Sequence, residues 1–253
     1  MLAREIIRPR IIGITGTNGK STTTALIGHI FGESNKKYQI GGNFGIPALD
    51  LETLDQSGTY ILELSSYQLE RVPSLLLDLA ILMNISPDHL DRHNGMEGYI
   101  NAKKNILTNL KPNSKAIIGM DDGFCRGICL EHMVKMGGDK IIPVSIKNRV
   151  PGGVYVDNGL LFDDIGNNAK VVLDLRDVTI LRGVHNWQNI AFAYAAAKLC
   201  GISEHDSLAA ITSFSGLEHR QNFIRKLGSV EFINDSKATN IEAAARALEA
   251  NSK

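Results

Sequence analysis

The stretch that most constrains the fold is residues 11–31, IIGITGTNGKSTTTALIGHIF. Its apolar beginning, which includes Ile11, Ile12 and Ile14, predicts a buried strand. A glycine-rich turn follows, and a helix-like segment then runs through Phe31. Glycines let a backbone approach an anion closely, because they carry no Cβ and tolerate positive φ. The order strand, glycine-rich turn, helix therefore predicts a phosphate-binding loop in an α/β fold.

The residues of this loop predict how it would hold an anion. Its backbone N–H groups and the start of the following helix would face phosphate oxygens. Lys20 would place a positive charge on the terminal phosphates, and Ser21 would offer its hydroxyl to Mg²⁺. The residues expected at the phosphates are Gly16, Thr17, Asn18, Gly19, Lys20, Ser21 and Thr22.

The match to the general phosphate-loop pattern has one departure. That pattern requires a glycine five residues before Gly19, and this chain has Ile14 there, with the glycine at Gly13. The local sequence GTNGKST is intact. A glycine-rich turn with a solvated lysine is the alternative to a phosphate site.

Charge and hydropathy argue against several classes of partner. The 253 residues carry 27 Lys and Arg against 27 Asp and Glu, so any anion site must be local and nucleic acid is not an expected partner. No apolar run reaches ~18 residues and no signal-peptide pattern opens the chain, which argues against membrane insertion and favours a cytoplasmic location. Cys125 and Cys129 lie four residues apart near His132, as metal ligands or, more commonly, as helix packing residues.

Strands and helices are expected to alternate along most of the chain. Such alternation predicts an α/β fold with a mostly parallel phosphate-loop sheet flanked by helices. Between Val150 and Asp177, short apolar segments separated by turn residues predict a small antiparallel β edge. The other expected strands are Tyr60–Leu64, Leu79–Met83, Lys115–Gly119, Lys140–Ser145 and Val230–Ile233. Helices are expected at Ala48–Leu54, Tyr99–Ile106, Asp122–Met136, Ile190–Cys200, Glu204–Phe214 and Ile241–Ala250.

Polar residues at or near the ends of these strands are candidate ligands. Glu63 is a carboxylate inside an apolar strand, where an unpaired charge is costly, so we expect it to bind Mg²⁺ or to form a salt bridge. His89 follows the next strand in NISPDHLDRH, as a metal ligand or as a solvated loop residue. Asn43, in the turn-rich segment GGNFGIP, either faces a second anionic ligand or belongs to a plain loop.

Two asparagines form a further candidate site. Asn186 and Asn189 are three residues apart in GVHNWQN, so they share one face if the helix starts early. Their amides would then hydrogen-bond a purine or a phosphate. The alternative is that Asn186 caps the helix.

Several segments together resemble the Mur ligase family of amide-bond-forming ATPases. They are GITGTNGKST, LELSSYQLE, NISPDHLDRH, YINAKKNI, GVHNWQN, GLEHR and INDSKATN, in the family's order. LELSSYQLE and INDSKATN are most similar to the members that add D-glutamate. The resemblance implies an ADP-forming carboxylate–amine ligase of peptidoglycan precursor synthesis that uses ATP and Mg²⁺. Its substrates would be UDP-N-acetylmuramoyl-L-alanine and D-glutamate, joined through an acyl phosphate.

The resemblance also implies roles for individual residues. Tyr99 places the family's carbamylated lysine at Lys103, with Lys104 as the alternative. The residues implied as catalytic are Lys20, His89 and Lys103, and those implied at Mg²⁺ are Ser21, Glu63, His89 and Lys103. The nucleotide would also meet Asn186, Asn189, Arg220, Asp235 and Lys237, and the UDP-sugar peptide would meet Asn43, Ser65 and Gln68.

The resemblance further implies a domain organisation. Members of the family have a UDP-binding domain, a central ATPase domain and a C-terminal domain. Residues 1–217 would form the central domain and residues 218–253 the beginning of the third, without the first. We therefore expect a chain that is weak or inactive alone and that self-associates through its C-terminal segment.

Other functions remain open for a loop of this kind. A folylpolyglutamate synthase-like ligase would use the same ATP chemistry on another substrate. A nucleotide-binding remnant would bind Mg-ATP without turnover. A kinase or GTPase fits less well, because the GTP-specific sequence Asn-Lys-x-Asp is absent and the later segments would go unexplained.

Overall fold

The computed structural model of the protein describes residues 8–178, 180–181, 183–238, 244–245 and 248. The helix expected at Ile241–Ala250 therefore lies mostly outside the described residues. Within them, no helix is long and apolar enough to cross a membrane.

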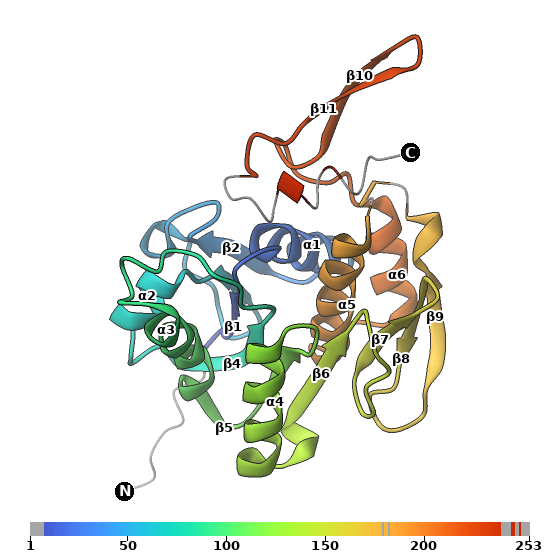
Figure 1. Ribbon diagram of the computed structural model, residues 1–253. Coiled ribbons are helices and arrows are strands. Elements are labelled where there is room, and N and C mark those ends of the chain that lie inside the picture. Colours follow the sequence, from blue (N-terminus) through green and yellow to red (C-terminus); the bar gives the residue numbers. More distant parts are fainter. Residues whose placement is uncertain (1–7, 179, 182, 239–243, 246–247, 249–253) are drawn as a thin grey trace, which may run out of the picture.

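One mixed sheet of nine strands forms the centre of the fold (Figure 1). Its order is β2-β3-β1-β4-β5-β6-β7-β8-β9, and every pairing from β2 to β7 is parallel. Strands β8 and β9 pair antiparallel at one edge, which confirms the predicted α/β class. The nine strands are β1 (Arg10–Thr15), β2 (Tyr38–Gly42), β3 (Thr59–Glu63), β4 (Leu77–Leu82), β5 (Leu110–Gly119), β6 (Ile141–Ser145), β7 (Val154–Asp157), β8 (Leu160–Asp163) and β9 (Lys170–Asp174).

Helices cover both faces of this sheet (Figure 1). Helices α1, α5 and α6 pack on one face, and α2, α3 and α4 pack on the other. Ile117 belongs to the first buried cluster and its neighbour Ile118 to the second, because side chains alternate across a strand that is covered on both sides. The helices are α1 (Lys20–Glu33), α2 (Ser66–Arg71), α3 (Met96–Thr108), α4 (Gly123–Met136), α5 (Val184–Leu199) and α6 (Glu204–Ser213), with short 3-10 turns η1 (Ala48–Asp50), η2 (Gly138–Lys140) and η3 (Leu175–Asp177).

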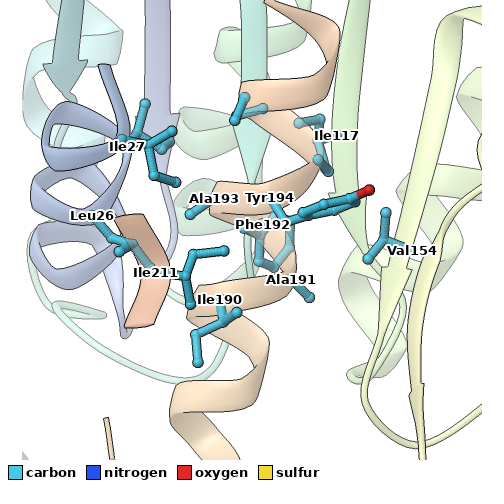
Figure 2. Close-up of a cluster of buried hydrophobic side chains, with 14 of the residues drawn as sticks. Leu26, Ile27, Ile117, Val154, Ile190, Ala191, Phe192, Ala193, Tyr194 and Ile211 are labelled. Atoms are coloured by element: carbon cyan, nitrogen blue, oxygen red, sulfur yellow. The ribbon is translucent and has the colours of Figure 1, made fainter. Parts of the chain in front are cut away.

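Helix α5 is buried around nearly its whole circumference. Every residue from Ile190 to Ala197 is at most 1% exposed. Figure 2 shows these side chains packed against Leu26 and Ile27 of α1 and against the sheet, with Tyr194 directed toward Val154. Burial of this much apolar surface fixes α5 firmly. The polar N-terminal turn of α5 is therefore held at a defined place beside α1.

A buried carboxylate ties the antiparallel edge to the same helix. Asp163 of β8 accepts a hydrogen bond from the Tyr194 hydroxyl at 2.8 Å and forms an ion pair with Lys198. A carboxylate that is 1% exposed needs such partners, because an unpaired buried charge is strongly destabilising.

A separate hairpin follows the sheet along the chain. Among the described residues, strands β10 (Asn222–Leu227) and β11 (Val230–Asn234) pair only with each other, in a two-stranded antiparallel sheet. Figure 1 shows the hairpin projecting from the edge at which α1 begins. Its apolar residues are about half exposed, namely Phe223, Ile224, Leu227, Val230 and Phe232.

Some local expectations differ from the structure. The helix expected at Ala48–Leu54 is wrong, because only the turn η1 forms and Leu51 is extended with ψ 143°. None of the η1 residues is buried, so no apolar contact stabilises a longer helix. Strands β2 and β10 were not predicted, since their sequences YQIGG and NFIRKL gain their conformation from pairing with β3 and β11.

The two cysteines of α4 are packing residues. Cys125 and Cys129 are fully buried free thiols in the cluster beneath α3 and α4. Nδ1 of His132 bonds to the carbonyl oxygen of Ile128, 2.9 Å away. No group of three or more His, Cys, Asp or Glu residues in the described part of the chain is arranged to hold a metal.

Candidate functional site

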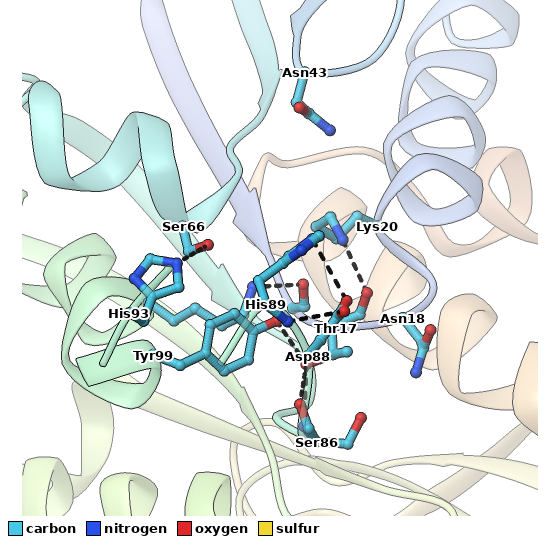
Figure 3. Close-up of polar contacts among 12 residues, drawn as sticks. Thr17, Asn18, Lys20, Asn43, Ser66, Ser86, Asp88, His89, His93 and Tyr99 are labelled. Atoms are coloured by element: carbon cyan, nitrogen blue, oxygen red, sulfur yellow. Dashed lines mark hydrogen bonds and ion pairs between the residues drawn. The ribbon is translucent and has the colours of Figure 1, made fainter. Parts of the chain in front are cut away.

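The candidate site lies where β1, β3 and β4 end. In the parallel register, Ile14 is paired with Glu63 and Thr15 with Leu82. The segments that leave these strands therefore emerge at one edge of the sheet, beside the N-terminus of α1. Figure 3 shows Thr17, Lys20, His89 and Tyr99 gathered at this edge.

The loop before α1 has the geometry expected of a phosphate loop. Gly19 is the N-cap of α1 with φ 83°, and no side chain caps the helix. The first N–H groups of α1 are therefore available to an anion, and the helix dipole favours negative charge there. A Cβ at Gly19 would lie 2.3 Å from Oδ1 of Asn189, so the loop approaches α5 too closely for any other residue.

Asn84, two residues after β4, forms hydrogen bonds with the backbone of the loop. Its Oδ1 accepts from the backbone N–H of Thr17 at 3.1 Å and of Asn18 at 2.9 Å. Its Nδ2 donates to the carbonyl of Asn18 at 3.0 Å. No role was predicted for Asn84, although its position as the first polar residue after a buried strand was a signal in the sequence.

Two cavities open on either side of the loop. The first has a volume of about 360 Å³ and the second about 520 Å³. Asn18, Gly19, Arg220 and Lys237 line both, so the cavities are two parts of one depression.

The first cavity combines amides with apolar walls. Asn186 and Asn189 line it from α5, with their side chains joined by a hydrogen bond of 2.9 Å from Nδ2 of Asn189 to Oδ1 of Asn186. Asn186 does not cap α5, because the helix starts at Val184 with Gly183 as its N-cap. The remaining lining includes Asp235, Gln188, His185, Leu181, Phe223 and Ile233. A flat ring with polar edges, such as a nucleobase, suits this lining.

The second cavity is lined by a buried carboxylate, one oxygen of which has no hydrogen-bond partner among the described residues. Glu63 is 1% exposed, and its Oε1 accepts from Nδ2 of Asn43 at 2.7 Å. Its Oε2 has no hydrogen-bond partner among the described residues. Ser21 and Lys20 line the same cavity. Mg²⁺ binds carboxylate, hydroxyl and phosphate oxygens, so this buried oxygen beside a phosphate loop fits that ion better than it fits a salt bridge.

Three cations surround the loop. Nζ of Lys20 donates to the carbonyl of Thr17 at 2.9 Å, and burial lowers the pKa of Lys20, partly opposed by the charge of Glu63. Nη2 of Arg220 donates to the hydroxyl of Ser21 at 3.0 Å. Lys103 is the third, and it contacts the loop at Gly16.

Lys103 is the most confined of these cations. It is 2% exposed, and its Nζ donates to the carbonyl of Gly16 at 2.7 Å. Burial, followed by repulsion from Lys20, lowers the pKa of Lys103 to about 7. Lys104 instead points to α4 and forms an ion pair with Glu131 at 2.6 Å. Of the two candidates, only Lys103 adjoins the loop.

The histidines of NISPDHLDRH occupy different environments. His89 lines the second cavity with φ 50° and a side chain 52% exposed, 3.7 Å from Asp88. His93 is buried, with Nε2 2.9 Å from the Ser66 hydroxyl and Nδ1 3.2 Å from Glu70. The sequence analysis missed His93, which joins α2 to the segment that carries His89.

Two expected substrate residues have local structural contacts. Ser65 and Gln68 form a capping box at the start of α2: the Ser65 hydroxyl accepts from the Gln68 N–H, and Gln68 Oε1 accepts from the Ser65 N–H. Neither residue lines the two cavities, whereas Asn43 lines the second. The geometry thus groups most of the expected loop, Glu63, His89, Asn186, Asn189, Arg220, Asp235 and Lys237 around one depression, and it leaves Lys103, Ser65 and Gln68 outside both cavities.

A glycine-rich loop that opens a helix at the carboxyl edge of a parallel sheet defines the class of phosphate-loop nucleotide-binding proteins. Comparison with known proteins is more specific: residues 14–197 match the Mur ligase middle domain. The chain belongs to the Mur ligase family, which confirms the resemblance seen in its sequence.

Individual relatives agree with this assignment. The chain is 48% identical over 241 residues to a UDP-N-acetylmuramoylalanine--D-glutamate ligase of Caulobacter vibrioides, covering 95% of this chain and 51% of the relative. It is 49% identical over 248 residues to a ligase of the same name from Rhodospirillum rubrum, covering 98% and 52%. The chain spans about half the length of the curated relatives it matches. A solved UDP-N-acetylmuramoyl-L-alanyl-D-glutamate--2,6-diaminopimelate ligase shares the fold, with a TM-score of 0.73, 23% identity and coverage of 96% of this chain and 53% of the other.

The close approach of the loop to α5 yields a prediction. Gly19→Ala should weaken binding of Mg-ADP at least about tenfold in calorimetry, because the new methyl group displaces Asn189 and disfavours the left-handed backbone. Gly123→Ala is the matched control, since a Cβ there meets nothing within 4 Å. Equal affinity in Gly19→Ala and the unaltered chain would contradict this account of the loop.

Proposed function

We propose that this chain binds Mg-ATP and supplies the phosphoryl-transfer part of an ADP-forming carboxylate–amine ligase. The observation that carries the proposal is Lys103, buried against the phosphate loop with its pKa lowered to about 7. Phosphate binding alone does not require a second lysine that is half neutral. A neutral amine can take up CO₂, and the carbamate that results is an anionic oxygen ligand for a metal.

The nucleotide is proposed to span both cavities. Its base would lie against Asn186 and Asn189, and its phosphates would meet the loop N–H groups and Lys20. Arg220 and Lys237 border both cavities, and Asp235 borders the first, so these residues would meet the nucleotide from the side of the hairpin.

Glu63 and Ser21 are the proposed ligands of Mg²⁺ at this site. The support is the unpaired buried oxygen of Glu63 beside the hydroxyl of Ser21 in one cavity. When bound, the ion would neutralise phosphate charge during transfer. His89 and a carbamate on Lys103 are the proposed ligands of a second ion, and of these His89 lines the same cavity.

The proposed reaction has two stages. A substrate carboxylate attacks the γ-phosphorus of ATP, which releases ADP and leaves an acyl phosphate. An amine then attacks the acyl carbon, and inorganic phosphate leaves as the amide forms. Lys20, the loop N–H groups and Arg220 would offset the charge that develops on the transferred group, in a site whose burial strengthens each interaction.

The substrates proposed are UDP-N-acetylmuramoyl-L-alanine and D-glutamate. The support is the name shared by both curated relatives and their identity of nearly half over almost all of this chain. Asn43, and Ser65 and Gln68 at the start of α2, would contact the UDP-sugar peptide. A panel of acceptors, including a folate, separates this proposal from a folylpolyglutamate synthase-like activity.

The same proposal covers the domain organisation, the self-association and the location of the chain. Residues 1–217 would be the central domain and residues 218–253 part of a third domain, since within the described residues the hairpin pairs only with itself. The half-exposed apolar residues of the hairpin would allow self-association. A cytoplasmic location follows from the proposed use of ATP.

The binding part of the proposal is tested with a non-hydrolysable ATP analogue. Lys20→Ala should weaken binding of this analogue with Mg²⁺ by at least about tenfold, because a charge-assisted contact to phosphate is lost. Lys36→Ala, at an exposed lysine just beyond α1, is the control and should bind normally. Absence of binding by the folded, unaltered chain would refute the proposal.

The ligase-specific part of the proposal is tested at Lys103. With ¹³CO₂, NMR should detect one carbamate signal that is lost in Lys103→Arg and kept in Lys104→Arg. Because the folded-state pKa is about 7, the neutral amine and hence the signal should increase as the pH is raised from 6 to 8. An ordinary lysine would be roughly a thousandfold less neutral at pH 7. A signal that survives in Lys103→Arg would overturn the assignment.

A further inference from the structure

The side chains behind the phosphate loop form a continuous series of hydrogen bonds. A carboxylate oxygen of Asp121, just after β5, accepts from Nε2 of Gln188 at 2.9 Å. Oε1 of Gln188 accepts from Nδ2 of Asn84 at 3.1 Å. Oδ1 of Asn84 then accepts from the N–H groups of Thr17 and Asn18 at 3.1 and 2.9 Å. We refer to Asp121, Gln188 and Asn84 as the amide relay.

We propose that Asp121 is a positioning residue for the phosphate loop and acts on it through the amide relay. The inference rests on the proposed function, because it concerns how the loop is prepared for a nucleotide. Asp121 itself lines neither cavity, whereas Gln188 and Asn84 line the first.

The chemistry of the three side chains fixes the direction of the relay. A carboxylate only accepts hydrogen bonds, whereas an amide has one accepting and one donating end. Gln188 must therefore turn its NH₂ group to Asp121, which leaves its oxygen for Asn84. Asn84 must turn its NH₂ group to that oxygen, which leaves its own oxygen for the loop. One charge outside the cavities thus favours the orientation in which Oδ1 of Asn84 faces the loop N–H groups and Nδ2 faces the carbonyl of Asn18.

The far end of the relay is anchored to the neighbouring strand. The Ser145 hydroxyl donates to Oδ1 of Asp121 at 2.6 Å, and the N–H of Ile146 lies 3.2 and 3.1 Å from its two oxygens. Gln188 and Asn84 are 6% and 8% exposed, so little water is available to replace a lost partner. The orientation of Gln188 therefore depends on Asp121, and that of Asn84 depends on Gln188 together with the loop.

The near end of the relay acts on the part of the loop that precedes the phosphate site. Asn84 binds both the N–H and the carbonyl of Asn18. Gly19 and Lys20 follow directly and line the second cavity. A loop held in its binding conformation before the nucleotide arrives binds more tightly than one that must first be ordered.

The relay makes a specific prediction for Asp121→Asn. In this variant the Ser145 hydroxyl and the Ile146 N–H compete with Gln188 for the one oxygen of the new amide. When that oxygen faces Ser145 and Ile146, the NH₂ group of the amide meets the NH₂ group of Gln188. Gln188 and Asn84 must then rotate in turn, and the loop N–H groups meet an NH₂ group. We expect Mg-ADP affinity, measured by calorimetry, to fall about tenfold.

A second substitution should reverse the effect. In Asp121→Asn with Gln188→Glu, the carboxylate moves to position 188, accepts from both neighbours and restores the orientation of Asn84. We expect Mg-ADP affinity within about threefold of the unaltered chain. Gln188→Glu alone sets two carboxylates against each other and should bind weakly. This comparison holds even if Asp121→Asn alone fails to fold.

Tyr194→Phe is the matched control. Tyr194 lies on α5, as Gln188 does, but it lines neither cavity, and the variant removes its buried hydrogen bond to Asp163 of β8. It should therefore lower the melting temperature and leave Mg-ADP affinity unchanged. The hydrogen-exchange rates of the Thr17 and Asn18 backbone amides measure the order of the loop without any nucleotide. Exchange should be faster in Asp121→Asn and return to normal in the double variant.

Three results would count against these claims in different ways. Normal Mg-ADP affinity and normal exchange in Asp121→Asn would overturn the relay while the nucleotide site stands. If the double variant binds Mg-ADP no more tightly than Gln188→Glu alone, Asp121 does not set the orientation of Gln188 and Asn84. An unaltered chain that binds no Mg-ADP would refute the proposed function, and the exchange rates would still decide whether the relay orders the loop.

Discussion

The parallel register of β3, β1 and β4 is the constraint on which the site depends. It brings the ends of three strands to one edge, although Thr15, Glu63 and Asn84 are far apart in sequence. Parallel strands require cover on both faces, and the crossover helices provide it. The same crossover sets the N-terminus of α1 directly after the loop. The anion-binding geometry is therefore a consequence of the sheet order and not of the loop sequence alone.

The buried helix α5 completes the site from a distant part of the chain. Its apolar middle packs under α1 and on the sheet, and this leaves its polar first turns facing the loop. Gly19 and Asn189 are in such close contact that the loop and α5 must be positioned together. Core packing thus determines the relative position of two groups of polar residues.

The charges at the site favour an anionic ligand. Burial lowers the pKa of both Lys20 and Lys103, and repulsion from a neighbouring cation adds to it, from Arg220 at Lys20 and from Lys20 at Lys103. Glu63 has an oxygen without a partner in the described part of the chain. A phosphate would pair with the lysines and a divalent cation with Glu63, so a bound metal–nucleotide complex would relieve both costs. Such a ligand would also stabilise the folded chain by mass action.

Features that depend on a local sequence pattern could be predicted from the sequence. The phosphate loop, most of the parallel strands and the position of Glu63 follow from apolar runs and glycine spacing. Asn84 was signalled by its place as the first polar residue after a buried strand, but the roles of Gln188 and His93 could not be predicted, because they depend on contacts with residues far away in the chain. The capping box of Ser65 and Gln68 was a local signal that the motif resemblance obscured. The helix expected at Ala48–Leu54 failed because propensity without burial does not stabilise a helix.

We propose that one sheet edge joins an anion site to a metal site at Glu63. Electron paramagnetic resonance of Mn²⁺ in the presence of ADP tests it most directly. The account predicts a bound Mn²⁺ signal in the unaltered chain and its loss, by at least about tenfold in metal affinity, in Glu63→Gln, which keeps the size of the side chain and removes its charge. Mn²⁺ binding of equal strength in both proteins would contradict the account.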